Sequence, residues 1–177
     1  GRETVNRFYS ATPAIVQKKM DQFAQLTGRQ YKLVEYSGAP DAEMVIVIMG
    51  TGAKTAATTV EQLNREGYKC GVLNVRLFRP FPGKELIEAL PKTVKKIAVL
   101  DRIKEPGSAG EPLYIDVATA CSQALNDGRL RADRYPTVVG GRFALGGKEF
   151  TPAMVKGVFD MLSTPKPKNG FTVGIVD

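Results

Sequence analysis

The chain has 177 residues, of which 43% are hydrophobic and 24% are charged, and its formal net charge is +7. This length fits one domain with a sizeable buried core, and the composition is ordinary for a globular protein. No apolar run approaches the roughly 20 residues that span a bilayer, and the N-terminal sequence lacks the apolar core of a signal peptide. These features exclude a membrane protein and predict a cytoplasmic location.

The positive charge could indicate an anionic partner such as nucleic acid. However, the basic residues are spread along the chain among Asp and Glu, and the aromatic residues do not alternate with Arg as on a base-stacking surface. We therefore expect no nucleic-acid partner. A basic docking face for an acidic electron carrier remains a possible interpretation.

The chain has no histidine, which removes the commonest general base and the commonest transition-metal ligand. Without histidine, no serine has an obvious activating partner. The two cysteines, Cys70 and Cys121, cannot supply the four thiolates of an iron–sulfur cluster or a structural zinc site. We expect both to be buried as small hydrophobic side chains. The sequence thus predicts no catalytic residue, no metal site and no cofactor in this chain.

The hydrophobic pattern alternates between helices and strands. The predicted helices are Thr12–Leu26, Ala53–Leu63, Lys84–Leu90, Leu113–Leu125 and Thr151–Leu162. The predicted strands are Tyr31–Tyr36, Met44–Met49, Gly71–Leu77, Lys96–Leu100, Thr137–Val139 and Phe171–Val176. The alternation predicts a three-layer α/β/α sandwich with a mostly parallel sheet of five to six strands.

The N-terminal boundary follows from Thr12 and Pro13, which are typical of an N-cap and of the first position of a helix. We therefore assign residues 1–10 to an N-terminal tail or linker and residues 11–177 to the domain. Residues 1–10 and the Pro/Lys stretch near Pro165 are expected to be mobile. The first residue is Gly1 rather than Met, so we expect the natural chain to be longer.

Two turns follow predicted strands, at the edge where α/β sheets bind ligands. The first, GTGAKT at Gly50–Thr55, has the strand-to-helix position of a phosphate site, but it lacks the spacing of a dinucleotide fingerprint or a P-loop. Gly50 and Gly52 are therefore either a tight turn or a weak anion site. The second is DRIKEPG, Asp101–Gly107, in which Arg102, Lys104 and Glu105 belong either to an interface or active-site wall or to a solvated charged loop.

Two further loops combine arginine with phenylalanine. In RLFRPFP, Phe78 and Phe81 lie beside Arg76 and Arg79, and the two phenylalanines either pack on this domain's own core or need another domain to cover them. In GGRFALGGKEF, glycines surround Arg142 and allow close approach, for domain packing or for a ligand.

Several segments occur together in fixed order: VRLFRPFP, VLDRIKEPG, EPLYIDV and VVGGRFALGGKEFTPAMVKGVFD. This combination resembles the second, transketolase C-terminal-like domain of pyruvate:ferredoxin (flavodoxin) oxidoreductases, over about Ala11–Asp177. The turn at Gly50–Thr55 and Ile103 depart from the pattern of that family. No catalytic residue of the family has a matching position here.

The resemblance implies a parent enzyme, a homodimer, that cleaves pyruvate to acetyl-CoA and carbon dioxide. Such an enzyme uses thiamine diphosphate with Mg²⁺, coenzyme A and [4Fe-4S] clusters, and passes electrons to ferredoxin or flavodoxin. The first hypothesis is that this chain is a structural and interface domain that contacts the other domains of the parent, supports its thiamine site and is inactive alone.

Two alternatives stay open. The chain could be a stand-alone domain that binds an anionic ligand such as CoA near Gly50 and Asp101, or a docking module for an acidic electron carrier. The features that separate the three hypotheses are the exposure of Phe78, Phe81 and Phe143, and whether Gly50–Thr55 forms an anion-binding nest.

Overall fold

The computed structural model describes residues 1–175, and its strands form one six-stranded sheet. The strands are β1 (Val34–Gly38), β2 (Met44–Met49), β3 (Cys70–Val75), β4 (Lys96–Asp101), β5 (Thr137–Arg142) and β6 (Phe171–Thr172). The helices are α1 (Asn6–Thr27), α2 (Gly52–Arg65), α3 (Gly83–Ala89), α4 (Pro112–Asn126) and α5 (Pro152–Ser163). Short 3-10 helices are η1 (Arg2–Val5), η2 (Ala132–Arg134) and η3 (Leu145–Gly147).

The sheet order is β1-β3-β2-β4-β5-β6, and each neighbouring pair is parallel except β1 with β3. Strand β2 lies between β3 and β4, with Met44 beside Cys70 on one side and Lys96 on the other. Its run from Val45 to Ile48 is completely buried, as a parallel strand covered on both faces requires. The predicted mostly parallel sheet is thereby confirmed.

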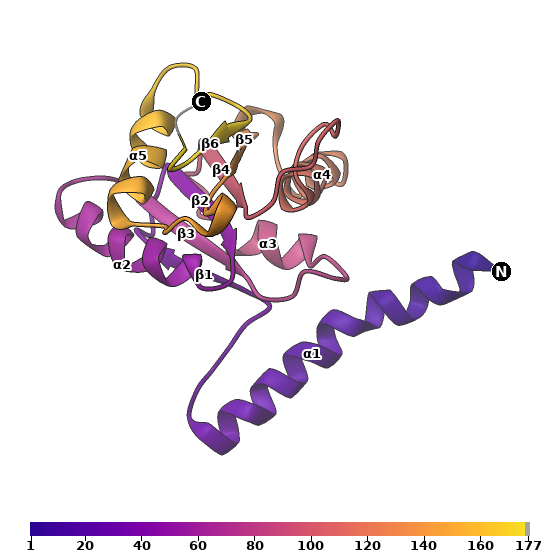
Figure 1. Cartoon of the computed structure of the whole chain (residues 1–177). Coiled ribbons are helices and arrows are strands. Elements are labelled where there is room, and N and C mark those ends of the chain that lie inside the picture. The colour runs from indigo at the N-terminus through magenta and orange to yellow at the C-terminus, as the bar shows by residue number, and fades with distance from the viewer. Residues whose placement is uncertain (176–177) are drawn as a thin grey trace.

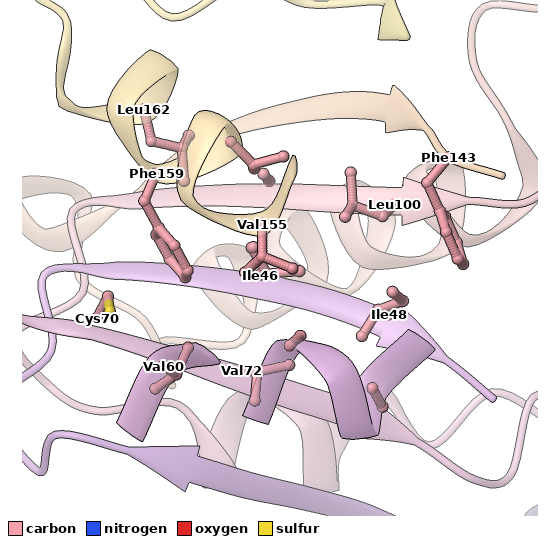
Figure 2. Packing of buried hydrophobic residues seen from close by; sticks show 14 of the residues in the cluster. Ile46, Ile48, Val60, Cys70, Val72, Leu100, Phe143, Val155, Phe159 and Leu162 are labelled. Carbon is pink, nitrogen blue, oxygen red and sulfur yellow. The ribbon is translucent and has the colours of Figure 1, made fainter. Parts of the chain in front are cut away.

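Helices cover both faces of the sheet and create two cores (Figure 1). Helices α2 and α5 pack on one face, where Ile46 and Ile48 of β2 meet Val60 and Phe159 (Figure 2). Helices α3 and α4 pack on the other face. Successive strand residues point to opposite faces, so neighbouring residues of β2 enter different cores. The result is the three-layer arrangement that the sequence predicts.

Helix α1 begins at Asn6, which differs from the predicted start at Thr12 and Pro13. Pro13 lies inside the helix, where its ring nitrogen removes only one donor from the hydrogen-bond ladder. The Thr12 hydroxyl does not cap the helix; it donates to the Phe8 carbonyl at 2.8 Å, one turn earlier. Residues 2–10 are therefore helical, through η1 and the first part of α1. Their role as a linker remains a prediction.

The other elements agree with the predicted pattern within a few residues. Thr151 caps α5 as expected, since its hydroxyl oxygen accepts the Met154 N–H at 3.4 Å. Strand β6 ends at Thr172, and the predicted continuation to Val176 ends outside the described residues. Among residues 1–175, no helix is both long enough and apolar enough to cross a membrane.

Both cysteines are free and buried, as the sequence predicts. Burial raises the pKa of Cys70 to about 12 and that of Cys121 to about 11. Each thiol therefore stays protonated at neutral pH and acts as a small hydrophobic side chain in its core.

Candidate functional site

The carboxyl ends of the parallel strands meet at one edge of the sheet, which brings several of the predicted loops together. A pocket of about 170 Å³ lies at this edge, where the turn after β2 approaches the end of β4. Gly50 and Gly52 of the turn line it together with Arg102. The remaining lining residues are Met49, Thr51, Leu100 and Phe143. Three predicted site residues from two separate loops thus form one small site.

The turn at Gly50–Gly52 is built for a tight reversal into α2. Gly50 has a φ of +73°, a left-handed conformation that favours glycine. Its carbonyl accepts the Ala53 N–H at 3.2 Å, and the Thr51 carbonyl accepts the Lys54 N–H at 3.0 Å. These two N–H groups are engaged within the turn, so they are not a run of free donors for an anion. The geometry favours the tight-turn interpretation.

Gly52 is required for close packing, which gives a testable stability effect. A methyl group there would lie 2.8 Å from Phe143 Cε2 and 2.9 Å from Ile48 Cδ1, both in buried side chains. We expect Gly52→Ala to lower the free energy of unfolding by about 1–3 kcal/mol. In the control, Gly157→Ala within α5, the methyl meets nothing within 4 Å. We expect this control to raise stability by about 0.5–1 kcal/mol. Urea denaturation compares the two variants, and a Gly52→Ala protein as stable as the unsubstituted chain would contradict the packing argument.

A buried carboxylate at the end of β4 caps helix α4. Asp101 is 3% exposed and accepts the backbone N–H groups of Leu113 at 2.9 Å and Tyr114 at 3.1 Å. Burial raises the pKa of Asp101, and these two donors oppose that rise. The sequence interpretation placed Asp101 in a charged loop, as part of an interface or a solvated surface. It missed the cap because the partners lie 12 and 13 residues away, beyond any local pattern.

A second buried carboxylate, Glu111, ties the loop after β4 to the end of the neighbouring strand β5. It is 3% exposed, its Oε1 accepts Arg142 Nε at 2.6 Å, and Lys104 Nζ lies 3.8 Å away. Arg142 Nη1 also donates to the Gly170 carbonyl and to Thr172 Oγ1, both at 3.1 Å. The predicted site residues Lys104 and Arg142 thus share a carboxylate that the sequence interpretation did not single out.

The ion pair lowers the pKa of Glu111. Burial alone would raise this pKa, but the hydrogen bond and the charge of Arg142 outweigh it, so the pKa lies below its ordinary value of 4.5. Glu111 therefore stabilises the fold above the unfolded value, and this contribution is lost as the pH falls below about 4.5 through the folded pKa. Asp101 acts with the opposite sign, because its pKa is raised.

We accordingly expect Glu111→Gln to flatten the fall of the unfolding free energy between about pH 5 and pH 3. Urea denaturation at a series of pH values measures this slope as a difference from the unsubstituted chain. The charge of Glu111 is also a lesser cause of the raised pKa of Asp101, so the measured difference includes that coupling. Glu61→Gln removes a carboxylate whose side chain is 67% exposed and should leave the slope unchanged. If the unfolding free energy fell equally steeply with pH in all three proteins, the lowered pKa of Glu111 would be contradicted.

Two other predicted arginines lie at the same edge but do not line the pocket. Arg76 Nη2 pairs with Glu35 Oε2 at 2.5 Å, and its guanidinium lies 4.6 Å from the centre of the Tyr31 ring. Arg79 Nη1 pairs with Asp116 Oδ2 at 2.5 Å. Both arginines thus hold segments of this chain together. The peptide bond between Arg79 and Pro80 is cis, which no pattern in the sequence indicated.

The aromatic residues that could have marked an uncovered surface pack on this chain itself. Phe78 and Phe81 are half-buried against the core formed with α3 and α4. Phe143 is 5% exposed, and its ring centre lies 4.8 Å from that of Phe150. Of the two alternatives for these phenylalanines, the structure favours packing on their own core.

The charged loop after β4 also contains Arg102 and Glu105. Arg102 is exposed and, among residues 1–175, makes no ion pair within 4.0 Å. Glu105 is half-buried, and its backbone carbonyl accepts the Ser108 N–H at 3.3 Å. Within residues 1–175, no group of three or more His, Cys, Asp or Glu side chains is arranged to hold a metal ion.

The strand order and the covering helices define the chain as a three-layer α/β domain with one antiparallel edge strand. At the carboxyl ends of its strands, Arg76, Arg79 and Arg142 pair with carboxylates of the same chain. Residues 42–155 match the family described as "Pyruvate:ferredoxin oxidoreductase core domain II". The chain belongs to this family.

Relatives with this description extend over almost the whole chain. A putative pyruvate-flavodoxin oxidoreductase of Synechocystis is 58% identical over 99% of this chain and 14% of its own length. A pyruvate-flavodoxin oxidoreductase of Trichormus variabilis is 57% identical with the same coverage. The pyruvate:ferredoxin oxidoreductase of Moorella thermoacetica is 53% identical, again over 99% of this chain and 14% of its own. The chain therefore spans about one seventh of the length of these relatives.

A solved 2-oxoglutarate:ferredoxin oxidoreductase from Magnetococcus marinus superposes with a TM-score of 0.46 and 23% identity. The superposed part is 78% of this chain and 21% of the solved chain. This likeness is weak, so the account of the fold rests on the strand order and layers described above.

Proposed function

We propose that the chain is one region of a longer pyruvate:ferredoxin or pyruvate:flavodoxin oxidoreductase, in which it packs and orients neighbouring regions and contributes no reacting group. The parent, a homodimer in this proposal, would convert pyruvate to acetyl-CoA and carbon dioxide and pass electrons to ferredoxin or flavodoxin. Thiamine diphosphate, Mg²⁺ and [4Fe-4S] clusters would be held by regions outside this chain. Residues 11–177 would be the packing domain, and residues 1–10 the link to the preceding region.

One observation carries this proposal: 99% of the chain aligns at 58% identity with only 14% of a much longer relative. A region that matches so completely, and yet forms so small a part, is best understood as a module of that enzyme. The oxidoreductase activity is proposed for this chain only as a part of such a longer enzyme.

The chemistry of the carboxyl edge supports a packing role. Arg76, Arg79 and Arg142 each pair with a carboxylate of this chain. Side chains that are already paired hold loops in one shape, and recruiting them to a ligand would leave their present partners without a counter-charge. The edge therefore suits the presentation of rigid loops to a neighbouring region better than the binding of a mobile ligand.

A second candidate function, the binding of an anionic ligand, is favoured by one feature, the pocket that joins Arg102 to the turn at Gly50–Gly52. Its volume of about 170 Å³ is well below the roughly 300–1,000 Å³ of sites for organic ligands. This pocket could take one small acidic group, but it is too small for a whole CoA molecule.

Calorimetric titration of the 177-residue chain tests the packing role. We expect no binding of CoA, of thiamine diphosphate with Mg²⁺, or of ferredoxin, and no pyruvate-dependent dye reduction by the chain alone. The longer enzyme should show that activity and lose it when residues 42–155 are removed.

Two outcomes would contradict the packing role. Saturable CoA binding lost in Arg102→Ala, but kept in the control Arg134→Ala at the opposite edge, would establish a ligand site instead. Ferredoxin binding that weakens with salt would favour the docking module.

A further inference from the structure

Helix α1 carries most of the uncovered apolar surface. Among residues 1–175, six of the nine exposed large hydrophobic side chains lie in or beside this helix. They are Val5, Phe8, Tyr9, Ile15, Phe23 and Leu26, with exposed fractions of 36–86%. Six large apolar side chains exposed on one helix are more than the scattered single residues normal for a free monomer, and such a concentration marks an interaction site.

The body of the chain already holds one side of α1. Val16 and Met20 pack against the core formed with α3 and α4. Gln17 donates from Nε2 to the Tyr31 carbonyl at 3.0 Å and accepts the Leu33 N–H on Oε1 at 3.2 Å. These contacts fix the rotation of the helix about its axis. The exposed side chains cannot turn inward without breaking them, so the uncovered face needs another partner.

The uncovered face has the pattern of a helix that lies in a groove. At about 100° per residue, Phe8, Ile15 and Leu26 project in nearly the same direction and Val5 lies beside them, with the polar pair Lys19 and Gln22 between Ile15 and Leu26. Phe23 lies beside this face, where it stacks on Tyr31. The helix is about 33 Å long and extends away from the α/β body in Figure 1, with the N-terminus at its far end. Helix-in-groove recognition uses apolar anchors at this spacing.

The charges beside this face indicate the chemistry of the partner. Residues 2–27 contain four basic side chains, Arg2, Arg7, Lys18 and Lys19, and two acidic ones. Among the described residues, none of the four basic groups is in an ion pair. A groove with an apolar floor and carboxylates along its rim would complement both features.

We propose that α1 docks, by the face that contains Phe8 and Ile15, into an apolar, acid-rimmed groove on another region of the same polypeptide. About six sevenths of the Synechocystis relative lies outside the part that this chain matches, and a longer polypeptide of this kind would supply the groove. The inference rests on the proposed function, which supplies that longer polypeptide. It goes beyond that function by naming the docking element and the chemistry of its partner.

Hydrogen exchange of the α1 amides tests the proposal in the 177-residue chain and in the longer polypeptide. We expect exchange of residues 5–26 to be at least about tenfold slower in the longer polypeptide, because docking adds to the free energy of local opening. The double variant Phe8→Asp/Ile15→Asp should abolish this protection and lower the Tm of the longer polypeptide. Both side chains are 56–60% exposed in the shorter chain, so its Tm should not change.

The matched control is Ser10→Asp/Ala14→Asp, which adds the same charge to exposed positions on the opposite side of α1. This control should keep both the protection and the Tm of the longer polypeptide. A photo-crosslinker at position 15 should join α1 to a carboxylate-rich peptide within one polypeptide.

Several outcomes would overturn the docking proposal. These are equal exchange rates in the two proteins, equal effects of the two double variants, a crosslink between two polypeptides, or protection that requires vesicles of an anionic lipid. The proposed function fails by different readouts, namely catalysis or cofactor binding by the 177-residue chain alone. The two failures can therefore be told apart.

Discussion

Replacing Arg142 by methionine should lower the free energy of unfolding by about 3–5 kcal/mol, because it leaves a buried carboxylate without its partner. Glu111 is 3% exposed, and its remaining cation, Lys104, is half exposed at 3.8 Å. The substitution also removes the hydrogen bonds to Gly170 and Thr172 that hold β6 to β5. Urea denaturation at pH 7 measures the loss.

The control for this prediction is Arg65→Met. Arg65 pairs with Glu61 on the surface of α2, where both side chains are 67% exposed, and we expect its loss to cost at most about 1 kcal/mol. The second substitution Glu111→Leu in the Arg142→Met background should recover much of the loss, since no buried charge then remains. An Arg142→Met effect as small as that of Arg65→Met would show that water or Lys104 satisfies Glu111.

Replacing Phe159 by alanine should cost about 3–5 kcal/mol of stability, the loss of a large side chain from a closed core. Phe159 is completely buried between α5 and the sheet, in the same cluster as Ile46, Cys70 and Leu162 (Figure 2). A close-packed interior cannot refill the volume of a missing ring without backbone movement, so a cavity adds to the lost transfer free energy.

Phe8→Ala is the matched control, because it removes the same ring from a position that is 60% exposed on α1. In the 177-residue chain, this control should change stability by at most about 0.5 kcal/mol. Thermal and urea denaturation of the two variants compare them. If both losses were large, Phe8 would be packed in the shorter chain and the uncovered face of α1 would not exist.

The layered architecture could be predicted because it is encoded in short-range patterns. The apolar run of β2 indicated a strand covered on both faces, and Thr151 with Pro152 indicated the start of α5. The ordered segments from Val75 to Asp160 indicated the family by resemblance. Each of these signals lies within a few residues of the element it describes, and none depends on which strand becomes whose neighbour.

The structure brings some of the candidate site residues together and separates others. Gly50, Gly52 and Arg102 come together at one pocket, as expected for loops at the carboxyl edge of neighbouring parallel strands. Lys104 and Arg142 instead converge on Glu111, which begins the segment EPLYIDV but was not among the candidate site residues. The start of α1 was also missed, because the sequence interpretation gave Pro13 the role of a helix start although a helix can contain it.

The sequence alone determined the order of the elements, the covered parallel sheet, the burial of both cysteines and the family to which the chain belongs. Only the tertiary structure decided that Asp101 caps α4, that Arg142 neutralises Glu111, and that the uncovered apolar face lies on α1 rather than at the phenylalanines after β3. The physical reason is range. Periodicity and capping act over about one helical turn, whereas these contacts join residues 12 to 31 positions apart once strand order and register are set.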